Sequence, residues 1–149
     1  MSSSRITAPI NYLDLITVRD AEQHLHLTEN EDAAYVAGLI PTAIDMVEEY
    51  TGGAVLIGTY KLTLDYFPSY INIPKPPLNN LTNVTYYDNA NSLQTVDSGN
   101  YFTTELDYAK HYIIYPVSSY SWPSTYTRKG AVVVNYTAGR AVQDVPQAI

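Results

Sequence analysis

The 149-residue sequence contains no cysteine, which excludes disulfide bonds, thiolate metal sites and a cysteine nucleophile. It also lacks a charged-then-apolar leader at its start. Its apolar stretches are far shorter than the roughly 20 residues that a membrane-spanning helix needs. We therefore expect a soluble protein that is made in the cytoplasm and does not contact a membrane.

Basic residues are scarce, with eight Lys and Arg against fifteen Asp and Glu, and the charges are unevenly placed. Residues 1–50 contain nine acidic and two basic residues, whereas residues 51–149 are balanced, so the net charge of −7 lies in the first third. A protein that binds DNA tightly needs a basic surface to displace counterions from the phosphates. The composition therefore argues against specific DNA binding, although an acidic surface can lie near DNA and repel it.

Catalytic and metal-binding patterns are also missing. His24 and His26 are two residues apart, a spacing that does not place two side chains on one helix face, and His111 has no evident triad partner. Glu48 and Glu49 are adjacent and point apart on a helix, so they form a poor acid–base pair. There is no glycine-rich phosphate loop, nucleophile elbow or zinc spacing. The sequence predicts a protein that is not an enzyme and has no catalytic residue, metal or cofactor.

Helical periodicity is confined to residues 17–53. The preceding residues 1–16 have no clear period, and we expect an extended arm that orders only on a partner. Thr17 is predicted to cap a short helix, with Asp20 in its first turn, where an acid interacts favourably with the helix dipole.

A longer helix is predicted to begin at Asn30 or Asp32 and to end at Gly52, where glycine adopts the left-handed cap. Pro41 interrupts its hydrogen bonding, so a kink or a pair of shorter helices is expected there. One apolar stripe defines the helix through its steps of three and four residues. The stripe consists of Val36, Ile40, Ala43, Ile44, Val47 and Tyr50.

Residues 54–140 show the alternating pattern of β-strands, separated by Pro, Asn and Gly turns. Five to seven short strands are predicted, within residues 60–66, 70–73, 81–87, 93–96, 101–103, 112–115 and 131–136. Residues 141–149 resemble the start of a further helix or a tail. The expected fold class is therefore α+β, with helices first and a β-rich part after them.

Aromatic residues are dominated by tyrosine, with fifteen Tyr against two Phe and one Trp. Tyrosine favours both β-strands and half-wet interfaces. Trp122 lies in a loop between Tyr120 and Tyr126, and these three residues are candidates for a protein interface. Alternatively, Trp122 folds back over the β core. A carbohydrate-binding β module is a further interpretation of the abundant tyrosine.

Several segments together resemble one protein family in their order and spacing. These segments are residues 47–55 (VEEYTGGAV), 60–65 (YKLTLD), 73–78 (IPKPPL), 84–88 (VTYYD), 121–123 (SWP) and 132–139 (VVVNYTAG). Over roughly residues 17–149 the chain is similar to the phage head–tail connector family, also called adaptor or head-completion proteins.

This resemblance implies a structural role in the neck of a virion. Family members form a ring, usually twelve-fold, that binds the portal protein of the DNA-filled head and offers a docking surface to a stopper or another tail-side neck protein. Double-stranded DNA passes through such a ring without specific binding. Under this interpretation Asp45, Glu48 and Glu49 would line the channel and repel the phosphates. A stopper or tail-terminator role is the nearest alternative.

The resemblance also implies a small helical bundle that carries the β-rich part as an insertion. In the family a long apolar helix follows the region of Val145 and Pro146 and completes this bundle. The present sequence stops at Ile149. We therefore expect the C-terminal helix to be truncated or absent, or a neighbouring subunit to cover the stripe in its place.

Overall fold

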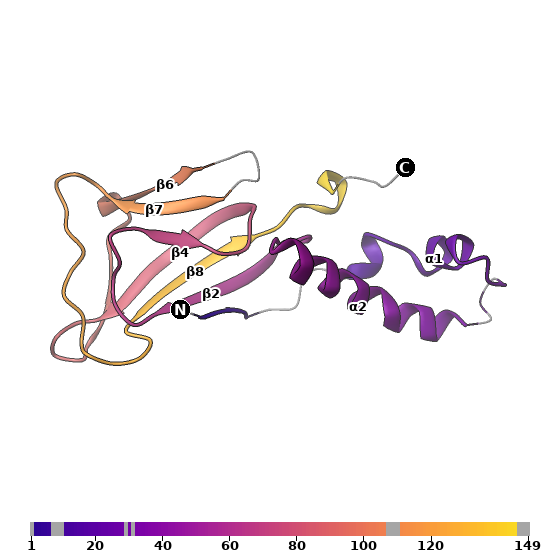
Figure 1. The fold of residues 1–149 in the computed structure, drawn as a ribbon, viewed down its shortest axis with the longest axis horizontal. Helices are drawn as coiled ribbons and strands as arrows, with labels where there is room; N and C mark the ends of the chain where they lie inside the picture. Colours follow the sequence, from indigo (N-terminus) through magenta and orange to yellow (C-terminus); the bar gives the residue numbers. More distant parts are fainter. Residues whose placement is uncertain (1, 7–10, 29, 31, 107–110, 146–149) are drawn as a thin grey trace.

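The computed structural model describes residues 2–6, 11–28, 30, 32–106 and 111–145, and it shows an α+β fold with two helices before most of the strands. The helices are α1 (Val18–His24) and α2 (Ala33–Thr51), preceded by a 3-10 turn, η1 (Tyr12–Asp14). The strands are β1 (Ser2–Arg5), β2 (Gly58–Leu64), β3 (Ile71–Ile73), β4 (Leu78–Tyr87), β5 (Leu93–Thr95), β6 (Tyr101–Glu105), β7 (Tyr112–Pro116) and β8 (Val132–Ala138). The molecule is elongated, with the helices projecting from one end of the β part (Figure 1).

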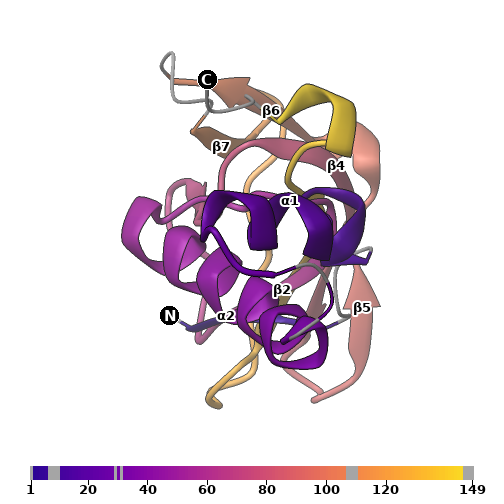
Figure 2. The same cartoon turned by 90° about the vertical axis from the view of Figure 1, so that its right-hand side faces the viewer.

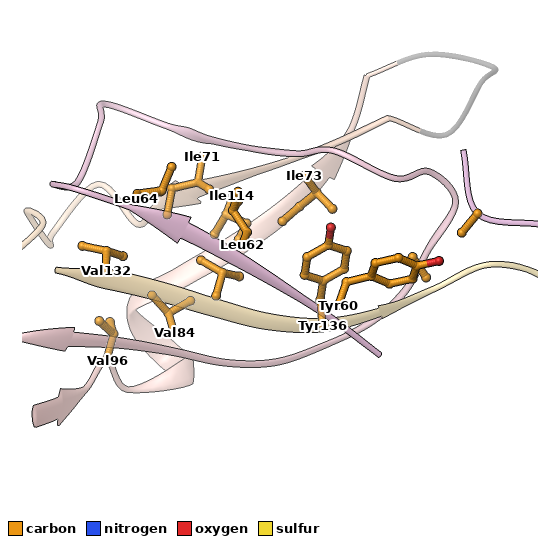
Figure 3. Packing of buried hydrophobic residues seen from close by; sticks show 13 residues of the cluster. Tyr60, Leu62, Leu64, Ile71, Ile73, Val84, Val96, Ile114, Val132 and Tyr136 are labelled. Carbon is orange, nitrogen blue, oxygen red and sulfur yellow. The ribbon is translucent and has the colours of Figure 1, made fainter. Parts of the chain in front are cut away.

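Among the described residues the strands form a five-stranded antiparallel sheet, in the order β1-β2-β8-β4-β5, and a three-stranded antiparallel sheet, β3-β7-β6. The two sheets pack face to face as a β-sandwich, and their buried side chains meet between them (Figure 3). Ile71, Ile73 and Ile114 come from the smaller sheet and contact the cluster that contains Leu62 and Val134 of the larger one. Five to seven strands were predicted in this part of the chain, and each predicted range corresponds to one of the strands β2 to β8.

Strand β8 lies at the centre of the larger sheet and alternates strictly between buried and half-buried residues. Val132, Val134, Tyr136 and Ala138 are completely buried and point into the sandwich. Inside the sandwich, Tyr136 stacks on Tyr60 of β2 with ring centroids 5.6 Å apart (Figure 3). Such pairs add about 0.5–1.5 kcal/mol beyond the burial of their area. This strand therefore connects β2 and β4, which are distant from it in the sequence.

The helices begin and end where the sequence predicts. The Thr17 hydroxyl accepts a hydrogen bond from the Asp20 N–H at 3.1 Å and caps α1. Gly52 ends α2 with a φ of +69°. Figure 2, viewed from the helical end, shows both helices in front of the sheets. Val36, Ile40 and Ile44 form the buried face of α2, packed against η1, α1 and Val55.

The expectations about α2 are met only in part. Pro41 lies inside one continuous helix, so only the alternative of two shorter helices is wrong. Ile40 and Ile44 are buried on either side of the missing hydrogen bond. Ala43, Val47 and Tyr50 belong to the predicted stripe but are exposed, Tyr50 almost completely. The buried face instead continues in steps of four residues to Glu48.

Both ends of the chain differ in part from expectation. Ser2–Arg5 is already ordered in the isolated chain, where it pairs with β2 as an edge strand. Val142–Asp144 forms a short 3-10 turn, and the rest of the predicted C-terminal helix, residues 146–149, lies outside the described residues. No helix in the described ranges is long and apolar enough to cross a membrane.

Candidate functional site

The described part of the chain has no cluster of three or more His, Asp or Glu side chains that could hold a metal ion. His24 lines an apolar groove between the two helices, and His26 is exposed just beyond α1. The structure instead offers a set of contact surfaces as the candidate site. These surfaces lie on α2, at the junction between α2 and the sandwich, and on two loops at residues 65–70 and 117–131. We call these two the tyrosine-rich loops, because they contain Tyr66, Tyr70, Tyr120 and Tyr126.

The three predicted acidic residues of α2 do not share one environment. Glu49 is exposed, and the Asp45 side chain is 61% exposed. Glu48 is buried, with a side chain only 6% exposed, although it is not one of the residues of the predicted apolar stripe. Its position follows from the step of four residues that also buries Val36, Ile40 and Ile44. Glu48 therefore cannot present a free carboxylate to DNA in this conformation.

The buried carboxylate of Glu48 is neutralised by Arg5 of β1. The Arg5 guanidinium donates a hydrogen bond to Glu48, and the Val55 N–H donates to the other carboxylate oxygen at 2.8 Å. Arg5 also donates to two phenolic oxygens, that of Tyr12 at 2.9 Å and that of Tyr60 at 2.7 Å. A buried charge is tolerated only with such partners, and these contacts link α2 to β1 and β2.

Two more contacts extend this network outward. The Tyr12 hydroxyl donates to Asp45 at 3.0 Å, and the Arg5 guanidinium lies 3.7 Å from the same carboxylate. The guanidinium carbon is also 5.3 Å from the centre of the Tyr60 ring, within cation–π range. Burial alone would lower the pKa of Arg5, but its hydrogen bond to Tyr60 and the charge of Glu48 raise it overall. We name this set of residues (Arg5, Tyr12, Asp45, Glu48 and Tyr60) the arginine junction.

The tyrosines of the arginine junction predict an alkaline loss of stability. Burial raises the pKa of Tyr60, and burial with the hydrogen bond to Asp45 raises that of Tyr12. Because the folded state then holds these protons more tightly than the unfolded chain, their contribution is complete below about pH 10 and is lost as the pH rises through the raised values. We expect urea unfolding to show a free energy that falls above pH 10, by up to about 1.4 kcal/mol per pH unit for each such tyrosine. The variant Tyr60→Phe should show a shallower fall, and an unchanged slope would contradict this assignment.

Sequence reasoning did not find the arginine junction. Arg5 and Glu48 are 43 residues apart, and Arg5 lies in a segment that we expected to be unpaired. One signal was available, because Glu48 continues the buried steps of four residues along α2, and a buried acid requires a cation. That signal indicates that a partner exists but does not identify it.

The three aromatic candidates of the loop lie in different settings. Trp122 is half-buried and stacks flat on Phe67, with ring centroids 4.8 Å apart, and Tyr120 meets it edge-on at 6.2 Å. The structure thus places Trp122 over the β core, which is the second of our two interpretations. Tyr126 is exposed beside Tyr66, which is 69% exposed. Of the candidates, Tyr126 is the most available to a partner.

A second face of α2 is apolar and exposed. Tyr35, Leu39, Met46 and Tyr50 follow one another at steps of four, seven and four residues, which places them along one side of the helix. No charged residue occurs between Ala33 and Ile44. An adjoining groove of about 310 Å³ lies between α1 and α2 and is lined by Leu25, Ile40 and other mainly apolar residues. A large exposed apolar surface of this kind marks a contact site.

Comparisons with known proteins support the fold through structure. Searches of models of protein families and of curated proteins found no match. Among solved structures, the chain is similar to one described as the neck of an empty gene transfer agent (GTA) particle computed with C6 symmetry, with a TM-score of 0.72 and 18% identity, over 93% of this chain and 71% of the other.

A structure of the virion of a native GTA particle matches with a TM-score of 0.71 and 24% identity, over 93% of this chain and 72% of the other. The neck of a native GTA particle computed with C12 symmetry matches with a TM-score of 0.65 and 20% identity, over 93% of this chain and 70% of the other. At these identities the likeness shows a shared fold.

Proposed function

We propose that this chain is a structural, non-enzymatic subunit of the neck of a phage or phage-like particle. Copies would form a ring, twelve-fold by the family resemblance, that joins the portal protein of the DNA-filled head to a stopper or other tail-side neck protein. The observation that carries this proposal is the match of 93% of the chain to chains in GTA neck and virion structures. The connector-like order of sequence segments supports the same role independently.

The exposed apolar face of α2 supports self-assembly. A side chain such as Met46 or Tyr50 gains about 25 cal/mol for each Å² of apolar surface that a neighbour removes from water. Large apolar residues in the centre of an interface carry much of its binding energy. In the proposed ring this face contacts the adjacent subunit or the portal.

Two acidic residues of α2 remain candidates for the wall of the DNA channel. Asp45 and Glu49 are exposed and belong to the part of the chain that carries the net negative charge. Carboxylates on a channel wall repel phosphates and let DNA pass without binding. A structure of the assembled ring with both carboxylates on its outer wall would refute this placement.

The tyrosine-rich loops are candidates for the tail-side contact. Tyr126 and Tyr66 are exposed together at a shallow pocket of the sandwich, close to Arg128. Loops rich in Tyr and Ser supply rigid aromatic area with adaptable hydrogen bonding, as in antibody paratopes. Trp122 and Tyr120 would support this surface from below, since they pack against the core cluster.

The ring predicts that a charge on the exposed face of α2 blocks assembly. Met46→Glu places a carboxylate in the proposed contact, and an unpaired buried charge costs several kcal/mol, so we expect at least a tenfold higher concentration for assembly. Mass photometry of the protein mixed with the portal of its own particle measures this. Asn89→Glu, which adds the same charge in an exposed turn, should assemble normally. Equal assembly of Met46→Glu and the unchanged chain would contradict the proposed interface.

A carbohydrate-binding module is a second candidate, favoured by one observation. Tyr70, Tyr115 and Phe102 form a row of adjacent rings, with centroids 5.7 and 5.9 Å apart, and Tyr70 and Phe102 are about half exposed. Such a row can stack on a sugar ring. Binding of the monomer to a glycan array would favour this alternative, whereas the exposed face of α2 would then have no role.

A further inference from the structure

Strand β1 is attached to the protein in an unusual way. Its sequence, Ser-Ser-Ser-Arg, has no apolar residue, yet it pairs with β2 from Ser2 opposite Thr63 to Arg5 opposite Tyr60. The pairing continues through the Ile6 N–H, which donates to the Thr59 carbonyl at 2.8 Å. Edge strands of this length gain little from backbone pairing alone. The specific attachment therefore rests on Arg5.

The surface that receives Arg5 has the features of a binding site. Glu48 is buried and is held in place from behind by the Val55 N–H, so its carboxylate faces the guanidinium in a fixed position. Tyr60 and Tyr12 add acceptors on the other sides of the guanidinium. Three acceptors in different directions match the forked donors of arginine, whereas lysine offers a compact ammonium group. The site thus selects arginine on an extended strand.

This site lies where an incoming strand can reach it. β1 is the outermost strand of the five-stranded sheet, so its replacement opens no other strand pair (Figure 1). Apart from Tyr12, the described residues that pair with β1 or bind the Arg5 side chain lie between Asp45 and Thr63. Every copy of the chain carries the same surface and the same strand. Exchange between two copies therefore keeps each of these bonds.

We infer that the arginine junction and the edge of β2 form a receptor site for an arginine-bearing strand, and that in the assembly the strand is Ser2–Arg5 of a second copy. The second step rests on the proposed ring, which brings copies together at a high effective concentration. Each subunit would then clamp its neighbour through a backbone-paired strand and a buried ion pair. The exchange adds a link that the apolar face of α2 alone does not supply.

Disulfide trapping between two copies tests the exchange, because the chain has no cysteine of its own. Ser4 and Lys61 are directly opposite on β1 and β2, and both are exposed. Full-length Ser4→Cys and Lys61→Cys chains are mixed in urea, refolded together at high concentration, divided into samples with and without portal rings, and oxidised. We expect a disulfide-linked heterodimer on a non-reducing gel. Its yield should fall at least tenfold when the Ser4→Cys chain also carries Arg5→Ala.

A matched control separates arginine recognition from general contact. Ile6→Ser changes an exposed neighbour of Arg5 and keeps the backbone bond to Thr59, so the yield should not change. Absence of the heterodimer, or an equal yield with and without Arg5, overturns the inference. Rings without heterodimers would refute the exchange and leave the neck role standing. Heterodimers without rings would support the exchange and count against the neck role.

Discussion

Replacing Arg5 by alanine is expected to lower the free energy of unfolding by about 3 kcal/mol, because it leaves the carboxylate of Glu48 buried without a cation. The loss includes the hydrogen bonds to Tyr12 and Tyr60, each of which contributes about 1 kcal/mol net. Urea unfolding followed by circular dichroism measures the change. Of a typical total stability of 5–15 kcal/mol, such a loss is a large part.

A double variant identifies the cause of that loss. Arg5→Ala together with Glu48→Ala removes both members of the ion pair, so no unpaired charge remains buried. We expect the double variant to lose no more stability than Arg5→Ala alone. Strictly additive losses, or a loss below about 1 kcal/mol for Arg5→Ala, would show that the arginine junction does not hold α2 to the sandwich.

Gly139→Ala is expected to prevent stable folding. Gly139 follows β8 with a φ of +111°, a conformation that L side chains rarely adopt. A Cβ atom at this position would lie 2.2 Å from the carbonyl oxygen of Leu56, which is backbone and cannot turn aside. The Gly139 N–H also donates to the Pro77 carbonyl at 2.9 Å, and a shift of residue 139 away from Leu56 would strain this hydrogen bond. We expect a loss above about 4 kcal/mol, seen as loss of the cooperative urea transition.

Gly38→Ala is the matched control. Gly38 lies in α2, and a Cβ atom there would have no neighbour within 4 Å. Alanine has the higher helix propensity, so this variant should be more stable by up to about 1 kcal/mol. If Gly139→Ala unfolds like the unchanged chain, the close approach of the two backbones at Leu56 is wrong.

Local patterns in the sequence predict the elements of this fold well. The strands β2, β3 and β8 follow from alternation, because each alternates between buried and more exposed residues. The cap at Thr17 and the left-handed Gly52 follow from side-chain and backbone chemistry that acts within one helical turn. These features depend on neighbours only a few residues away.

The arrangement of the elements depends on distant neighbours, and the sequence predicts it poorly. No local pattern places β8 between β2 and β4, or pairs Arg5 with Glu48. The stripe on α2 shows the same limit, because periodicity indicates an apolar side but not how far η1 and α1 cover it. Tyr50 is therefore exposed while Glu48 is buried.

The exposure of the candidate residues could be predicted only in part for the same reason. Asp45, Glu49 and Tyr126 are exposed, as residues that contact a channel or a partner must be. Glu48 and Trp122 are instead used within the monomer, one by an ion pair and one by an aromatic stack. Residue type alone does not separate these two outcomes, since both depend on packing across the fold.

Electron microscopy of the purified chain bound to the portal of its own particle tests the central claim most directly. The proposed neck role predicts a closed ring coaxial with the portal, with a central channel wide enough for double-stranded DNA and with the α2 faces of adjacent subunits in contact. A chain that stays monomeric beside the portal would contradict the neck role, as would one that binds elsewhere on the particle.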